Sequence, residues 1–232
     1  MSETLRTLGS QEIIFHGAFL GKICEFIHAK TIVEIGTQYG KTMRFLCEAA
    51  SRVNGMVFGY DYFDKIGKYT QGSQGDLDIS LKALSEFNNF KLTKINTMSD
   101  EFAEVLKKDT RGKIDFAFID GCHSYGGVKN DFRKVFPLLA KEGMIAFHDT
   151  FSHVGLRKFV ISLYEELNDG TFDIINLPFG GGNKRHGITL LSKRSYPNTN
   201  TGISNISHDP QLPPCDIYTL ENTWYNKMKA RK

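Results

Sequence analysis

The chain has 232 residues, which suits one domain with a terminal extension, and 41% of them are hydrophobic, enough for a substantial core. Its formal net charge of +3 comes from 29 basic and 26 acidic side chains, too even a balance to indicate nucleic acid as a partner. The four cysteines form no CxxC pair, which is typical of a reducing compartment. The polar first residues and the lack of a long apolar run predict a cytoplasmic protein without a membrane segment.

Helix and strand patterns alternate along the chain. Apolar positions at helical spacing predict helices over 11–28, 41–52, 77–87, 99–107, 130–139 and 156–167. Short apolar runs predict strands over 31–36, 55–61, 90–95, 114–120, 144–148, 172–177 and 188–191. Such alternation is typical of an α/β fold, a parallel sheet with helices on both faces. The last two strands have no helix between them and are expected to form an antiparallel hairpin.

The remaining segments predict loops and a tail. Residues 62–76 and 178–187 are polar and glycine-rich, and either could form a lid or an acceptor pocket. A solvated loop explains Arg185 and His186 in the second segment more simply than contact with an acceptor. We expect a folded domain over 1–194, followed over 195–232 by an extended or partly disordered tail rich in Asn, Ser, Thr and Pro. A short helical pattern spans 218–228 within this tail.

A glycine-containing turn follows the first predicted strand, in the segment Glu34-Ile-Gly-Thr-Gln-Tyr-Gly40. Glycines at such a turn allow the backbone to approach a ligand closely. The segment lacks the G-x-G-x-x-G of dinucleotide-binding folds, and only three residues separate its glycines, which excludes a P-loop. A plain strand-to-helix turn explains the glycines equally well.

Asp61 ends the second predicted strand, near the distance of about 20 residues expected between the glycine turn and a ribose-binding acid. A carboxylate there can accept hydrogen bonds from ribose hydroxyls. A solvated acid at a strand end is the alternative interpretation, and the nearby glycine turn favours the ribose site.

Residues 114–150 place titratable groups at two strand ends: Asp120 with His123 just beyond it, and then His148 and Asp149. Carboxyl ends of parallel strands share one edge of the sheet, where ligands bind. Asp120 and Asp149 are oxygen donors suited to Mg²⁺, His148 would favour a transition metal, and His123 is a candidate general base. Alternatively, Asp120 caps the next helix, and His148 points to the other face because neighbouring strand residues alternate.

Taken together, these segments resemble the class I S-adenosylmethionine-dependent methyltransferases. The resemblance rests on the glycine turn, Asp61, the segment Phe118-Ile-Asp-Gly-Cys-His-Ser-Tyr125, Asp131, and the segment from Glu142-Gly143 to His148-Asp149-Thr150. The pattern is most similar to a group with IDGxHxY and HD motifs that includes macrocin O-methyltransferase and cephalosporin-hydroxylase-like proteins. The match covers about residues 30–192. It implies a Rossmann-like seven-stranded methyltransferase sheet, mostly parallel, with an antiparallel C-terminal hairpin.

The resemblance also implies S-adenosylmethionine as the cofactor and assigns roles to residues. The implied cofactor-binding residues are Glu34, Gly36, Thr37, Gly40, Asp61, Met98, Ser99 and Asp120. Glu34, Gly36 and Gly40 would line the methionine end, Asp61 would hold the ribose, and Met98 and Ser99 would lie beside the adenine. His123 would be the catalytic base, with Asp120 as the second catalytic residue.

A divalent metal is implied in the same way. Relatives hold Mg²⁺ with an acid matching Asp120 and an acidic pair at the next strand end. Here that pair is His148–Asp149, so the metal ligands would be Asp120, His148 and Asp149. The imidazole leaves open whether Mg²⁺, Mn²⁺, a different metal or none is bound.

The leading hypothesis is O-methylation of a small-molecule or sugar hydroxyl, without nucleic-acid or membrane partners and with a homo-oligomer left open. A nicotinamide-dependent oxidoreductase is an alternative, although the third glycine and a Tyr-x-x-x-Lys pair are missing. A non-catalytic cofactor-binding module within an assembly is another. A nucleic-acid methyltransferase is disfavoured because the chain has no Asn/Asp-Pro-Pro-Tyr motif and no evident basic cluster.

Overall fold

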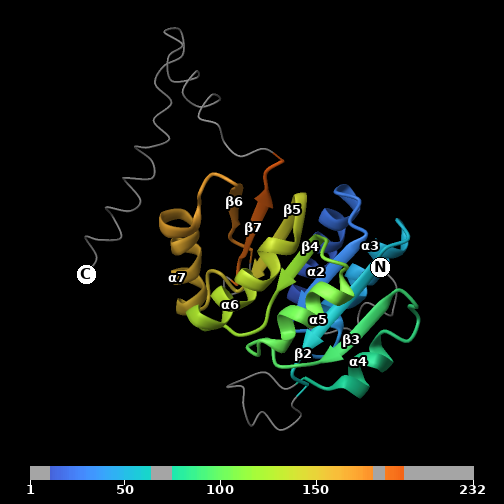
Figure 1. The fold of residues 1–232 in the computed structure, drawn as a ribbon. Coiled ribbons are helices and arrows are strands. Elements are labelled where there is room, and N and C mark those ends of the chain that lie inside the picture. The colour runs from blue at the N-terminus through green and yellow to red at the C-terminus, as the bar shows by residue number, and fades with distance from the viewer. Residues whose placement is uncertain (1–10, 64–74, 180–185, 196–232) are drawn as a thin grey trace. The chain divides into compact units, whose positions relative to one another are not determined.

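The computed structural model of the chain describes residues 11–63, 75–179 and 186–195. In it, seven strands form one sheet in the order β3-β2-β1-β4-β5-β7-β6 (Figure 1). The strands are β1 (Thr31–Ile35), β2 (Met56–Asp61), β3 (Phe90–Lys94), β4 (Ile114–Ile119), β5 (Leu139–His148), β6 (Phe172–Leu177) and β7 (Ile188–Lys193). The first five pair in parallel, and β7 runs antiparallel to both β5 and β6. The predicted fold class, with its antiparallel hairpin, is confirmed.

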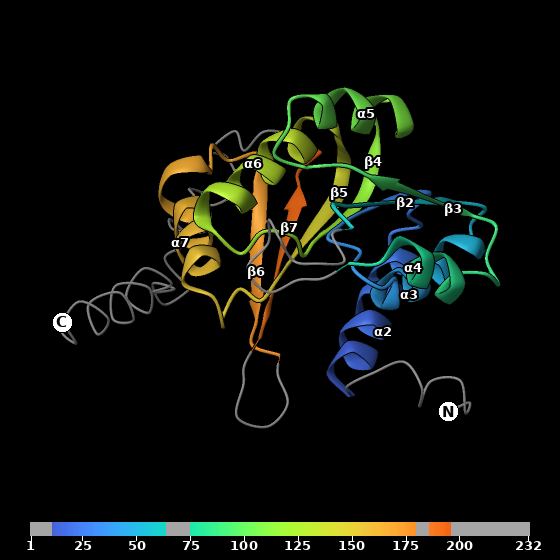
Figure 2. The same ribbon diagram turned by 90° about the horizontal axis from the view of Figure 1, so that it is seen from below.

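Helices cover both faces of the sheet (Figure 2). The helices are α2 (Gln11–Phe26), α3 (Lys41–Ser51), α4 (Leu77–Ala83), α5 (Glu101–Asp109), α6 (Tyr125–Val135) and α7 (Val154–Ser162). The first three lie on one face and the last three on the other, so the core has two halves. On β4, Phe116 and Phe118 pack into one half, whereas Ala117 and Ile119 pack into the other, as strand pleating requires. Among the described residues, no helix combines the length and apolar character needed to cross a bilayer.

Several element boundaries differ from those that the sequence predicts. Helix α6 begins five residues before the predicted 130 because the Ser124 hydroxyl accepts a hydrogen bond from the Gly127 amide at 3.0 Å and caps the helix. It gives way to a 3₁₀ turn at Phe136–Leu138, where Pro137 lacks the amide that a continuing α-helix needs. Strand β5 therefore begins at Leu139. Likewise, α7 ends at Ser162 and continues as a single π turn, Leu163–Leu167.

The strand order reverses between β1 and β4, and the loops that follow these two strands touch there. Gly36 has a φ of 90°, and a Cβ atom on it would overlap the carbonyl oxygen of Asp120. The Asp120 amide donates to the Ile35 carbonyl at 2.8 Å, which fixes the two loops against each other. Only glycine fits this position. The close approach of the two backbones fixes the Cα atom of Asp120, from which its side chain extends.

Asp131 is a fully buried carboxylic acid on α6. Its Oδ1 accepts a hydrogen bond from the Asn130 amide at 3.3 Å, and its Oδ2 has no hydrogen-bond partner among the described residues. Burial raises the pKa of Asp131 to about 6, against the opposing effects of Thr97, Asn130 and Lys134. The ionised carboxylate therefore costs the folded state free energy at neutral pH.

Some of the predicted segments lie outside the described residues. They include the tail from residue 196 onward with its helical pattern over 218–228, and most of loops 62–76 and 178–187. The predictions made for them, and the domain boundary at 194, stay predictions.

We expect Gly36→Ala to reduce the free energy of unfolding by well over 2 kcal/mol, because it adds steric overlap to the cost of a left-handed backbone. Gly112→Ala is the matched control, since Gly112 has a φ of 74° and no atom within 4 Å of an added Cβ. The control should lose only about 1–2 kcal/mol. Urea denaturation of both variants measures the difference, and equal losses would contradict the close approach.

We expect Asp131→Asn to change how stability depends on pH. The folded pKa of about 6 lies above the ordinary value of 3.8, so wild-type stability is lost as pH rises between these values. At pH 7.5 the variant should be more stable relative to wild type than at pH 4, by at most about 3 kcal/mol. Chemical denaturation at the two pH values tests this, with Asp100→Asn at the exposed start of α5 as the control. A variant-to-wild-type difference independent of pH would refute the prediction.

Candidate active site

A cluster of histidines and aspartates lies at the carboxyl ends of β4 and β5. Five of the six histidines that the structure describes belong to it, and each contacts another member of the cluster. Its members, hereafter the rim cluster, are His16, Asp120, His123, His148, Asp149, His153 and His186. The four residues that the sequence places at these strand ends are thus brought together, and three histidines join them.

A sharp turn allows His148 and Asp149 to face the same site. Strand β5 ends at His148, and Asp149 takes a left-handed backbone conformation with a φ of 57°. The strict alternation of a continuing strand therefore does not apply, and His148 Nδ1 lies 3.7 Å from Asp149 Oδ1. The alternative in which His148 points to the other face of the sheet is wrong.

Asp120 lies between two imidazoles. Its Oδ1 is 3.1 Å from His148 Nδ1 and 3.7 Å from His123 Nε2. Burial acts to raise the pKa of Asp120, but His148 and His123 outweigh burial and hold that pKa well below its usual range. Asp120 in turn raises the pKa of His123, against the effect of burial. The pair therefore combines a carboxylate that stays ionised with an imidazole of increased basicity.

His148 also contacts His16 on α2. Its Nε2 is 2.8 Å from His16 Nδ1, so both nitrogens of His148 lie within hydrogen-bond distance of other side chains. Burial first, and then His148 and His186, lower the pKa of His16 to about 4, so His16 is neutral at pH 7. The sequence analysis did not single out His16. Its position could have been inferred from the helical spacing, because His16 precedes the buried Leu20 by four residues and the buried Cys24 by eight, which places all three on the inner face of the helix.

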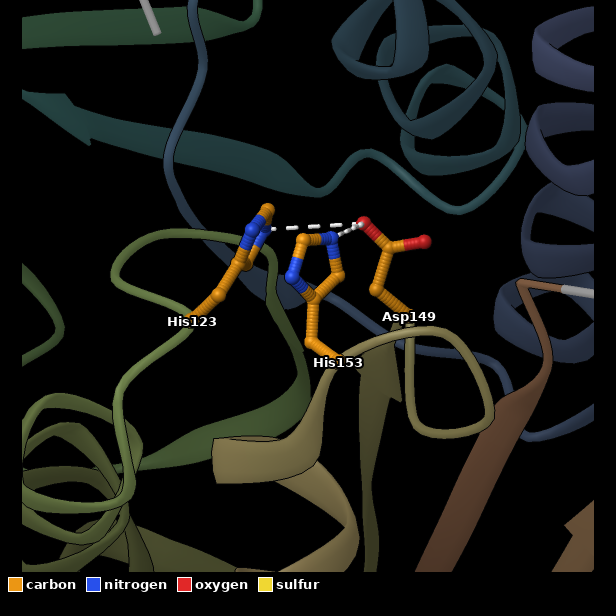
Figure 3. Close-up of side chains that lie close together, drawn as sticks. All are labelled: His123, Asp149 and His153. Atoms are coloured by element: carbon orange, nitrogen blue, oxygen red, sulfur yellow. Dashed lines mark ion pairs between the residues drawn. The ribbon is translucent and has the colours of Figure 1, made fainter. Parts of the chain in front are cut away.

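The two carboxylate oxygens of Asp149 contact different residues. Its Oδ1 accepts from the Ser152 hydroxyl at 3.0 Å and lies 2.6 Å from His186 Nδ1. Its Oδ2 lies 3.6 Å from Nε2 of both His123 and His153, and the two rings direct these nitrogens toward it (Figure 3). Burial first, and then His123, lower the pKa of His153, which favours its neutral form. His153 was missed in the sequence, although it follows Asp149 by four residues at the start of a helix.

A second set of predicted residues lies at the same edge, at the ends of β1 and β2. Glu34 is 1% exposed, and neither its Oε2 nor the Thr37 hydroxyl has a hydrogen-bond partner among the described residues. Burial raises the pKa of Glu34 well above its ordinary value. Asp61 accepts backbone hydrogen bonds from Gln38 at 2.8 Å and from Phe63 at 2.7 Å. The acid thus holds the glycine turn, which begins α3 at Gly40 with a φ of 72°.

Met98 and Ser99 lie in the loop after β3. Met98 is 51% exposed, and the Lys134 ammonium on α6 donates to the carbonyls of Thr97 and Ser99 at 2.7 Å each. The structure therefore ties this loop to α6, at the carboxyl edge of the sheet. Among the described residues, Met98 and Ser99 form hydrogen bonds with Asn96 and none with the rim cluster.

The chain is similar to a known protein family and to a curated protein. Residues 33–150, just over half of the chain, match the family model described as a methyltransferase domain. A curated relative, the uncharacterized protein y4gI of Sinorhizobium fredii, is 28% identical over 137 residues. That match covers 58% of this chain but only 15% of the relative's length.

Solved structures share the fold at low identity. An O-methyltransferase from Bacillus cereus in complex with SAH has a TM-score of 0.65 and 16% identity, with 84% of this chain and 92% of that chain covered. The O-methyltransferase TomG from Streptomyces achromogenes, in complex with SAM, gives 0.63 and 14%, covering 84% and 91%. An rRNA methylase from Streptococcus thermophilus gives 0.55 and 16%, covering 80% and 98%.

At these identities the likenesses establish the fold and leave the acceptor open. The family match is more specific, because it begins within β1 and ends at Thr150, directly after the turn that carries His148 and Asp149. The chain therefore belongs to the methyltransferase-domain family.

Proposed function

We propose that the chain is an S-adenosylmethionine-dependent methyltransferase that methylates a hydroxyl group of a small molecule or sugar. The observation that carries the proposal is the pairing of two sites at one edge of the sheet. A buried acid with an unpaired oxygen, Glu34, stands beside the Gly36 turn, and the charged pair of Asp120 and His123 follows the neighbouring strand. The SAM and SAH named with the solved relatives support the same cofactor. The IDGxHxY and HD motifs favour the subgroup that contains macrocin O-methyltransferase.

The residues present fit this cofactor. The unpaired Oε2 of Glu34 is an acceptor that an ammonium group can satisfy, and a cation there would offset the cost of burying the carboxylate. Each oxygen of Asp61 accepts one backbone amide, and a carboxylate has about four acceptor sites, so two ribose hydroxyls can still bind. The backbone of Gly36 and Gly40 is proposed to line the methionine end, and Met98 and Ser99 are proposed beside the adenine.

When bound, S-adenosylmethionine supplies a methyl group on a positively charged sulfur. The chain's own contribution begins with His123, whose side chain is 36% exposed and therefore accessible to an acceptor. Its neutral ring can take the proton of an acceptor hydroxyl, and Asp120 at 3.7 Å and Asp149 at 3.6 Å would stabilise the resulting imidazolium. The Gly36 turn packs against the loop after β4. This contact holds the two halves of the site at a fixed distance, which favours alignment of the reacting groups.

The predicted metal ligands are Asp120, His148 and Asp149. These residues fit a metal less well than the site fits the cofactor. One potential ligand atom from each lies within 4.8 Å of the others. However, His148 already uses Nδ1 toward Asp120 and Nε2 toward His16, and Asp149 Oδ1 is held by His186 and Ser152. Mg²⁺ prefers a shell of oxygens, of which this set offers only carboxylates from two residues. These three residues therefore do not fit a bound Mg²⁺ ion.

We expect S-adenosylmethionine and S-adenosylhomocysteine to raise the melting temperature of the purified chain, whereas NAD should not. At 100 times its dissociation constant, a ligand that binds only the folded state stabilises by about 2.7 kcal/mol. A thermal-shift series with the three compounds tests this. A shift with NAD alone would support the oxidoreductase, and no shift with either sulfur nucleoside would refute the proposed function.

We expect Glu34→Gln to act in opposite directions on stability and binding. The variant removes a buried group whose charged form is penalised, so the free chain should be at least as stable as wild type. It also removes the charge that would pair with the ammonium group, so cofactor affinity should fall roughly tenfold, about 1.4 kcal/mol. Calorimetric titration and thermal melting measure the two effects, with Asp100→Asn as the control. Unchanged affinity would remove Glu34 from the cofactor site.

We expect His123→Ala to lower the rate of methyl transfer by about 100-fold or more, the usual contribution of a general base. Cofactor affinity should stay within about threefold, because His123 lies on the other side of the strand-order reversal from Glu34 and Asp61. The assay measures S-adenosylhomocysteine formed with a panel of hydroxylated small molecules and sugars. The exposed His28 provides the control variant His28→Ala. Full turnover in His123→Ala would exclude the base.

A further inference from the structure

We propose that the rim cluster binds one divalent transition-metal ion through His123, Asp149 and His153. This set differs from the predicted metal ligands in two of its three members. It consists of two imidazoles and one carboxylate, and it draws on the loop after β4, the turn after β5 and the start of α7 (Figure 3).

The three ligand atoms already lie near the spacing that an ion needs. Nε2 of His123 and Nε2 of His153 are each 3.6 Å from Asp149 Oδ2, and all three atoms lie within 4.8 Å of one another. A tetrahedral ion with bonds of about 2.0–2.1 Å separates its ligand atoms by about 3.3 Å. To seat the ion, each carboxylate-to-imidazole distance would contract by a few tenths of an ångström, and the imidazole nitrogens, which lie within 4.8 Å of each other, would move to a similar separation. Both observed distances are too long for hydrogen bonds, so no such bond need break.

Contacts of Asp149 Oδ1 orient the carboxylate so that Oδ2 can bind the ion. Oδ1 is held by His186 Nδ1 at 2.6 Å and by the Ser152 hydroxyl at 3.0 Å, which fixes the plane of the carboxylate. Hydrogen bonds of this kind orient the ligands of protein metal sites and strengthen binding. Asp149 Oδ2 then faces the two imidazoles, as Figure 3 shows.

The alternative set shares Asp149, so one ion site excludes the other. An ion at Asp120, His148 and Asp149 would have to displace the contact of His148 Nδ1 with Asp120 at 3.1 Å. It would also compete for Asp149 Oδ1, the oxygen held by His186 and Ser152. The set of His123, Asp149 and His153 requires neither change, and it gives up only the longer contact, 3.7 Å, between His123 Nε2 and Asp120 Oδ1.

The donor types determine the class of ion. Two nitrogens and one oxygen suit Zn²⁺, Fe²⁺, Co²⁺ or Ni²⁺, whereas Mg²⁺ and Ca²⁺ take oxygen ligands. Three protein ligands leave at least one coordination position open, which is the arrangement of catalytic sites and not of closed structural ones. The side chains of His123 and His153 are 36% and 46% exposed, so that position is accessible from solvent.

The chemical role of the ion rests on the proposed function, although its binding does not. An ion in this position would lower the pKa of an acceptor hydroxyl and release its proton to solvent. His123 would then be a ligand in the metal-loaded protein and the proton acceptor only in the metal-free protein. A substitution of His153 distinguishes these two roles of His123. His153 is required as a metal ligand but takes no part in proton transfer to His123.

The test is metal binding by the tag-free full chain after chelator treatment. Co²⁺ is the probe, because its visible absorption reports nitrogen ligation and a low coordination number. We expect saturable binding of one Co²⁺ per chain, displacement by Zn²⁺ and none by a large excess of Mg²⁺. His153→Ala and His123→Ala should each weaken Co²⁺ binding at least tenfold, whereas the exposed His28→Ala should not change it.

Two further variants locate the ion. His148→Gln and Asp120→Asn should leave Co²⁺ affinity within about threefold of wild type. If these two abolish binding while His153→Ala does not, the ion lies in the other set and the proposal is overturned. Absence of Co²⁺ binding by wild type, or binding that His153→Ala leaves unchanged, overturns it as well.

Cofactor titration distinguishes this failure from failure of the proposed function. His153→Ala should bind S-adenosylmethionine like wild type, which also demonstrates that the variant is folded. Cofactor binding without metal binding would overturn the metal site alone. Metal binding without cofactor binding would overturn the proposed function alone.

Discussion

The backbone contact between Gly36 and Asp120 is the constraint on which the reactive edge of the sheet depends. The loops after β1 and β4 leave the sheet in different directions, yet here they pack without an intervening side chain. On one side of the contact stand Glu34 and Asp61, and on the other stands the rim cluster. Any substitution that pushed the two loops apart would change the distance between the proposed cofactor site and the rim cluster, which we propose activates the acceptor.

Within the described part of the chain, the rim cluster shows how imidazoles can stabilise buried carboxylates. Asp120 and Asp149 are neighbours of imidazoles, and contacts with these rings offset the cost of burying the carboxylates. His16 is the opposite case, because it is held neutral among other histidines. The cluster therefore combines Asp120, which stays ionised, with His16, which stays neutral, and such divergence of pKa values is typical of functional sites.

The sequence was sufficient to predict the sheet and the strand-end residues, and it failed where distant segments meet. Regular alternation of strand and helix patterns predicts the parallel order, and Asp120, His123, His148 and Asp149 follow from their places after strands. His16 and His186 could not be assigned, because their roles depend on how α2 packs and on the direction of β7. The turn at Asp149 was equally hidden, since no proline or glycine marks its left-handed backbone.

The direction of β7 has a consequence for how this fold can vary. Because β7 is antiparallel to β5, its first residue, Ile188, pairs with His148, the last residue of β5. Ile188 also pairs with Leu177, the last residue of β6, so the connection between β6 and β7 opens at the reactive edge. Paired strands fix the register on both sides of this connection. His186, which contacts Asp149, ties the end of this connection to the rim cluster. The residues before His186 can therefore vary in length and composition without disturbing the sheet, and under the proposed function acceptor choice could diverge there.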